Sequence, residues 1–138
     1  MGFIVTVGNN VTLGVEAVKT VDFLVATPQD SNARTTDLGV TLKVTGKILT
    51  ILDDGNESTV ELANWSMVPV EQADCYRTVT VKVIAANQVV RQYSLPNAFV
   101  VDYKETYGDT EGVGSFELIV KQKKDKVQQT DITGGYAE

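Results

Sequence analysis

Hydrophobic and polar residues alternate with a period of two through most of the second half of the chain, residues 76–123. The clearest example is Val79, Val81 and Val83, which are separated by polar residues. Similar alternation returns around Tyr93 and Leu95, Phe99, Val101 and Tyr103, and Phe116, Leu118 and Val120. Successive side chains of a β-strand point to opposite faces, so this period predicts a sheet with one buried and one solvated face.

Four strands are expected in this region. Residues 76–86 and 88–95 form a predicted hairpin around Ala86 and Asn87. Pro96 and Asn97 then separate that hairpin from a strand over 98–106, and a last strand covers 113–123. The pattern predicts that the alternate apolar residues, Val101 among them, face the core.

The first half of the chain also reads as extended. Strands are expected over 3–7, over 11–25 with a break near Gly14, and from Val40 to a break at Gly46. The polar segment 27–37 lies between them and has no apolar period. Loops of this length are uncommon in small domains and usually carry function.

One helix is predicted, over about residues 59–67. Ser58 and Glu61 have the spacing of a capping box, in which each side chain bonds the other residue's backbone N–H. Residues 53–56 before it read as a turn, and Pro69 ends the helical pattern. Within the helix, Val60, Ala63 and Met67 form one apolar stripe. Leu62 and Trp65 lie beside this stripe.

Composition narrows the possible functions. The 138 residues predict one domain, and a net charge of −6 argues against general nucleic-acid binding. Cys75 is the single cysteine and histidine is absent, so an internal disulfide, a Ser-His-Asp triad and imidazole metal sites are excluded. The sequence has no apolar run long enough to span a bilayer and no recognisable signal peptide, so neither membrane insertion nor ordinary secretion is expected.

Candidate catalytic groups do not assemble into a plausible site. Asp102 and Glu105 are three residues apart, which places them on opposite faces of a regular strand rather than facing one another. The segment 131–134 only approaches the aspartic-protease signature. We therefore expect a protein that is not an enzyme and that uses no cofactor and no metal.

Two segments resemble a known family. In 95–103, the Asn97-Ala98 step precedes an aromatic strand that ends in Tyr103, and the helix reads Leu-Ala-Asn-Trp-Ser-Met-Val-Pro over 62–69. With the order of the elements, these segments resemble the tube proteins of contractile injection machines. That family contains the haemolysin-coregulated protein (Hcp) of the type VI secretion system and phage-type tail tubes.

The resemblance covers residues 3–123 and implies a small β-barrel of two packed sheets with one flanking helix. It also implies a structural subunit that forms homohexameric rings, which stack into a hollow tube through the loop 27–37. The implied contacts between rings and subunits are Gln29, Asp30, Asn32, Arg34, Thr35, Thr36 and Asp37. The polar tail 124–138 is expected to order only against something else, such as an adjacent subunit.

Further partners implied by the resemblance are sheath, spike or baseplate proteins and effector cargo. A bacterial or phage origin is expected, with assembly in the cytoplasm and export as part of an injection particle. The alternative is a β-sandwich module that binds a ligand such as carbohydrate, and an exposed aromatic platform would favour it. Most aromatic residues here are in phase with Val, Leu and Ile, so we expect them to be buried. A hydrolase is the least favoured of the three functions.

Overall fold

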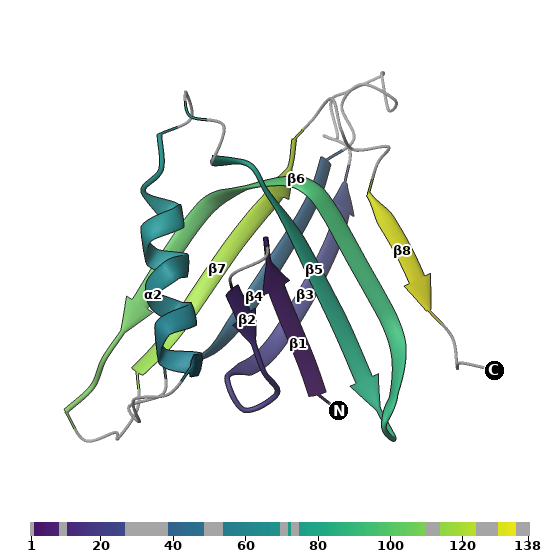
Figure 1. The fold of residues 1–138 in the computed structure, drawn as a ribbon, viewed down its shortest axis with the longest axis horizontal. Helices are drawn as coiled ribbons and strands as arrows, with labels where there is room; N and C mark the ends of the chain where they lie inside the picture. The colour runs from purple at the N-terminus through teal and green to yellow at the C-terminus, as the bar shows by residue number, and fades with distance from the viewer. Residues whose placement is uncertain are drawn as a thin grey trace.

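The computed structural model describes residues 2–8, 11–26, 39–48, 54–69, 72, 75–109, 114–123 and 130–134, and for 54–59 only the backbone. In these residues, eight strands form one antiparallel sheet, and a helix packs against it (Figure 1). This confirms the mainly β architecture with a flanking helix. The elements are β1 (Gly2–Val7), β2 (Val11–Leu13), β3 (Val18–Ala26), β4 (Gly39–Ile48), α2 (Asp54–Ser66), β5 (Arg77–Ala85), β6 (Gln88–Thr106), β7 (Gly114–Gln122) and β8 (Asp131–Gly134).

The strand order is β2-β1-β5-β6-β7-β4-β3, and β8 also pairs with β6. The long strand β6 divides this sheet into two layers, because its first half pairs with β5 and β8 and its second half with β7. We call β2, β1, β5, the first half of β6 and β8 the first layer. The second half of β6 with β7, β4 and β3 is the second layer. The two expected sheets are thus two parts of one continuous sheet.

The two layers face each other across the hydrophobic core. The ring of Phe23 on β3 stacks on Tyr93 on β6, with centroids 4.3 Å apart, and β1 also contacts β3. The predicted alternation is confirmed at the centre of the strands, where the inward side chains are almost inaccessible to solvent. The largest of them on the strands are Leu13, Leu42, Leu95, Leu118, Val5, Val7, Val11, Val44, Val79 and Val81.

No strand ends at Pro96 and Asn97, contrary to the predicted break. β6 runs on through both residues, and the pairing with β5 shifts there by one residue. The Asn97 N–H donates to the Gln122 side chain at 3.1 Å, and the Asn97 carbonyl accepts from the Lys123 N–H at 2.8 Å. These bonds satisfy the backbone at the irregularity, so the strand continues from one layer into the other.

A second irregularity changes which residues face the core. The pairing of β6 with β7 shifts between Val100 and Asp102, so Val101 has no partner of its own. Val100 packs against the core and Val101 is exposed, so the prediction that Val101 points inward is wrong. A β-bulge of one residue reverses the faces of the residues that follow it.

Gly46 does not interrupt its strand, since β4 runs on to Ile48. A Cβ atom at Gly46 would lie 2.1 Å from the carbonyl oxygen of Ala17 and 2.7 Å from the ring of Phe116. The absence of a side chain at Gly46 therefore allows the turn before β3 to pack closely against β4. There the Lys47 N–H donates to the Ala17 carbonyl at 2.7 Å.

The helix α2 begins at Asp54, earlier than predicted, and ends at Ser66. Ser58 therefore lies inside the helix, and the predicted capping box does not form its start. The predicted turn at 53–56 is also wrong for Asp54 to Asn56, which are helical. α2 packs against β2, β4 and β6, and its buried side chains are Leu62 and Trp65 rather than the stripe through Val60 and Met67.

Two turns and the tail complete the chain. Ala86 and Asn87 both have positive φ, 53° and 63°, which suits the two-residue hairpin predicted at this position. Four residues of the expected tail form β8, whose residues pair with 91–94 of β6 in the same chain. This part of the tail therefore needs no second molecule to become ordered.

Candidate assembly surfaces

The second layer has a free edge at each side. β3 pairs only with β4, and residues 99–106 of β6 pair only with β7, within the part of the chain that the structure describes. Unpaired strand edges present backbone N–H and C=O groups that can pair with another strand. Neither edge was predicted as a site, because the alternation of residues shows which face is buried but not which strand ends the sheet.

The directions of the strands make these two edges compatible. All pairings in the second layer are antiparallel, so β3 and the second half of β6 run in opposite directions. When the β3 edge of one copy meets the β6 edge of the next, the pair is again antiparallel. Contact between two different surfaces of one molecule repeats from copy to copy, and it closes into a ring when the rotation allows.

The face of the second layer that points away from the core carries mostly polar residues. The register places these residues on it: Thr20, Asp22 and Leu24 of β3; Thr41, Lys43 and Thr45 of β4; Phe99, Asp102, Lys104 and Thr106 of β6; and Ser115, Glu117, Ile119 and Lys121 of β7. Leu24, Phe99 and Ile119 are the apolar members of this set. Lys43 and Glu117 form an ion pair at 3.7 Å, and both side chains are exposed, so the pair adds little stability. Acidic and basic groups are mixed on this face.

One hollow opens beside this face, with a volume of about 230 Å³. It is lined by Lys19, Thr45, Gly46, Lys104, Thr106, Ser115, Phe116 and Glu117. Amines, hydroxyls and one carboxylate line it together with the ring of Phe116. Groups of three or more His, Cys, Asp or Glu that would suit a metal ion do not occur among the described residues.

A hydrogen-bonded cluster lies at the end of β6. The hydroxyl of Tyr103 donates to one oxygen of the Glu105 carboxylate at 2.6 Å, and that of Tyr107 donates to the other at 2.7 Å. Burial raises the pKa of Tyr103 well above its ordinary value, and the bond to Glu105 adds to this shift. For Tyr107 the bond to Glu105 is the main cause of a raised pKa.

The surface of the described residues offers no aromatic platform. Tyr107 is the only aromatic residue among them that is exposed, and Phe99, Tyr76 and Tyr93 are partly buried. Trp65 is 2% exposed and its indole N–H donates to the carbonyl of Cys75 at 2.9 Å, so its predicted role as a core residue is confirmed. Cys75 is itself buried with a free thiol. No described helix is long and apolar enough to cross a membrane.

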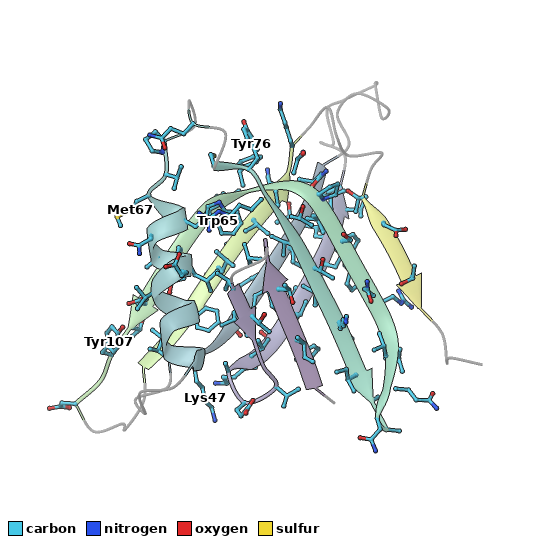
Figure 2. All side chains as sticks on the ribbon, in the orientation of Figure 1. Lys47, Trp65, Met67, Tyr76 and Tyr107 are labelled. Carbon is cyan, nitrogen blue, oxygen red and sulfur yellow. The ribbon has the colours of Figure 1, made fainter. Side chains whose placement is uncertain are left out.

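The predicted contact residues Gln29, Asp30, Asn32, Arg34, Thr35, Thr36 and Asp37 lie outside the described residues. Apolar side chains that the sequence did not single out for assembly are exposed on two other surfaces. One is the outer side of α2 and of the turn after it, where Met67 lies on the opposite side from Trp65 (Figure 2). The other lies between β3 and β8, around Val25 and Ile132.

Solved structures with the same arrangement of strands identify the fold. Hcp1 from Flavobacterium johnsoniae superimposes with a TM-score of 0.60 at 18% sequence identity, covering 100% of this chain and 99% of that chain. A type six secretion system protein gives a TM-score of 0.62 at 10% identity, over 88% of this chain and 79% of the other. The chain has an Hcp-like tail-tube fold.

A third structure extends the similarity to an extracellular injection particle. A chain of the PVC sheath–tube complex in its extended state gives a TM-score of 0.57 at 12% identity, over 97% of this chain and 89% of that chain. The sequence itself matches no protein-family model and no curated protein sequence. The Hcp-like fold is therefore recognised from the arrangement of the strands.

Proposed function

We propose that this protein is a structural, non-enzymatic subunit of a contractile injection or phage-tail-like tube. The observation that carries the proposal is the second layer, an antiparallel four-stranded unit with one free edge on β3 and one on β6. Such edges are usually blocked or covered in monomeric proteins because they promote association. The Hcp-like fold supports the same conclusion.

In the proposed ring, the β3 edge of each copy pairs with the second half of β6 in the next copy. Six copies are proposed because of the resemblance to Hcp and the tail tubes. The second layers of all copies then form one continuous barrel, whose polar outer face lines the channel. The first layer and α2 lie on the other side of the second layer, toward the outside of the ring.

Rings are proposed to stack through the loop 27–37, which directly follows the edge strand β3. Polar contacts to the next ring are assigned to Gln29, Asp30, Asn32, Arg34, Thr35, Thr36 and Asp37. The support for this assignment is that β3 ends at Ala26, directly before the loop in the sequence, and the end of an edge strand is at the rim of the layer, where a second ring would meet it.

Sheath, spike or baseplate proteins and effector cargo are the further partners we propose, with the tube as a component of an injection particle. Support comes from the sheath–tube complex in which one structural neighbour occurs. The remainder of the tail, outside β8, is assigned to contacts with an adjacent subunit.

The first experiment measures the assembly state of the purified protein. Size-exclusion chromatography with light scattering should give the mass of six copies, and negative-stain electron microscopy should show rings or short tubes. The free edges provide the reason, since their backbone N–H and C=O groups are available to pair with a strand of another copy. A monomer at every concentration would contradict the proposal.

The second experiment tests the loop. Deleting residues 29–36 should leave six-membered rings intact and prevent their stacking into tubes. The control is a variant in which the same residues are replaced by an equal number of Gly and Ser residues, which keeps the length and removes the polar side chains. Tubes that survive both changes would show that the loop does not join the rings.

A further inference from the structure

The two sides of the molecule are covered differently. On one side, α2 lies against β2 of the first layer and against β6 and β4 of the second (Figure 1). On the other side, β8 and β3 are the last strands of their layers, and none of the described residues forms a helix there. We call the exposed apolar surface formed by Val25 of β3 and Ile132 of β8 the slot.

The slot exposes side chains that face the core. Val25 pairs with Val40 and Ile132 pairs with Tyr93, so the register turns both toward the interior of the sandwich. Nevertheless, Val25 is 41% and Ile132 48% exposed. Beside them lie the stacked rings of Phe23 and Tyr93. The core is therefore open to solvent between the two last strands.

The outer side of α2 is apolar as well. Val60 is 54% exposed and Met67 is 72% exposed, although helices in water usually turn such residues inward. Val60 lies on α2, and Met67 lies in the turn directly after it, on the side away from Trp65 (Figure 2). Leu62 and Trp65 occupy the buried side, so the helix and the turn after it together carry apolar residues on both sides.

On the basis of the proposed ring, we propose that α2 of one copy covers the slot of the next copy. Val60 of α2 and Met67 directly after it then pack against Val25 and Ile132. The slot and α2 lie on opposite sides of one molecule, as a head-to-tail contact requires. Pairing the β3 edge with the next copy's β6 places that copy's α2 beside the slot, because α2 packs on β6.

Strand direction argues against the obvious alternative for β8. Every pairing in this sheet is antiparallel, but β8 and the next copy's β2 would run in the same direction. β2 also has only three residues. An apolar contact with the helix that covers β2 is therefore a better partner for β8 than an extension of the first layer.

The charges at the two surfaces are complementary. Glu61 is exposed on α2 between Val60 and Met67 in the sequence. Arg91 is exposed, lies two residues from Tyr93 on the same side of β6, and pairs with Gly134 of β8. A carboxylate on the helix and a guanidinium at the slot favour the head-to-tail orientation over contact between two helices or two slots.

The test uses single and paired charge substitutions in the full chain. Met67→Asp or Ile132→Lys alone places an unpaired charge in the contact, so each should weaken ring formation at least about tenfold. The double variant places the new carboxylate on α2 of one copy beside the new amine in the slot of the next, and it should recover rings. Val15→Asp is the control, since Val15 is exposed but belongs to neither surface.

Cysteine cross-linking identifies the partner surfaces directly. In a Cys75→Ser background, Met67→Cys combined with Ile132→Cys should give oxidised products that extend beyond dimers to a hexamer. Either cysteine alone cannot extend beyond a dimer, because each chain then carries one thiol. A variant with cysteines at positions 15 and 132 should give no ladder, that is, no series of cross-linked products beyond the dimer.

The outcomes separate this contact from the ring itself. Undiminished rings in both single charge variants, with no cross-linked ladder, would overturn the contact and leave the tube proposal in place. An unchanged protein that forms no rings would overturn the tube proposal and this contact with it. Loss of rings in the single variants, their recovery in the double variant and a ladder to the hexamer would establish the contact.

Discussion

One carboxylate at the end of β6, that of Glu105, accepts hydrogen bonds from two tyrosine hydroxyls. Glu105 accepts a bond from Tyr103 on one oxygen and from Tyr107 on the other. Tyr103 and Glu105 are two apart on β6 and project to the same side, and the Tyr107 side chain, directly after the strand, reaches the same carboxylate. The arrangement stiffens the end of β6, whose outer edge is the one we assign to the neighbouring subunit.

The raised pKa of Tyr103 predicts a loss of stability at high pH. An ordinary tyrosine has a pKa of about 10, and the unfolded chain therefore releases its proton before the folded chain does. The contribution of Tyr103 is complete below that pH and is lost above it. Urea unfolding at several pH values above about 10 should show the free energy of unfolding fall less steeply for Tyr103→Phe than for the unchanged protein. Equal slopes would show that Tyr103 does not cause the loss.

Local sequence predicts a residue's face only while the strand stays regular. Val79 and Val81 are buried as expected, since no bulge separates them. Val101 was assigned to the wrong face because the bulge depends on pairing with β7, which is not visible in the alternation of β6 alone. Asn97 likewise continues its strand through a bond to Gln122, 25 residues away in the sequence.

Among the elements, α2 has the clearest division of roles. Its buried side carries Trp65, which lies 5.5 Å from the guanidinium carbon of Arg77 and bonds the backbone at Cys75. Met67, directly after its last residue, lies on the outer side (Figure 2). Removing a side chain from one side should therefore affect folding, and removing one from the other should affect association.

Trp65→Ala should lower the free energy of unfolding by about 3–5 kcal/mol, because it leaves a cavity in the core. Met67→Ala should change it by less than about 0.5 kcal/mol, because that side chain is solvated in the monomer. Chemical denaturation followed by circular dichroism measures both, and it does not depend on the single tryptophan for signal. Equal losses in the two variants would contradict the assignment of the buried side.

The type of each main element was predictable, and the boundaries were less so. Residues 54–56 read as a turn because Asp, Gly and Asn favour turns, yet they form the start of α2. Packing against three strands outweighs that local preference. The exposed stripe on α2 had a signal in the sequence: Val60 and Met67 fall on the opposite side from Leu62 and Trp65, and one of two apolar sides must face outward.

The molecule as a whole carries a charge of −6, so like charges accumulate when copies associate. Adding salt should therefore increase the fraction of rings, since it screens repulsion between subunits and leaves backbone pairing and apolar contacts largely unaffected. Analytical ultracentrifugation over a range of sodium chloride concentrations measures this fraction. Dissociation at high salt would instead indicate that ion pairs between subunits hold the ring together.

The candidate site was only partly predictable at this scale. The family resemblance implies contacts through the loop 27–37, but the free edges of β3 and β6 follow from the strand order, which alternation does not specify. The slot was not predictable either. It depends on β8 pairing with β6, and the polar composition of the tail gave no indication of a strand there.

The continuity of β6 has a mechanical consequence. A tensile force applied to β3 of one copy is transmitted through β4 and β7 to the second half of β6. The first half of the same strand is hydrogen-bonded to β5 and β8. Between the halves the load crosses covalent peptide bonds rather than an interface of packed side chains. A tube built from such subunits can be driven forward without its inner wall shearing away from its outer layer.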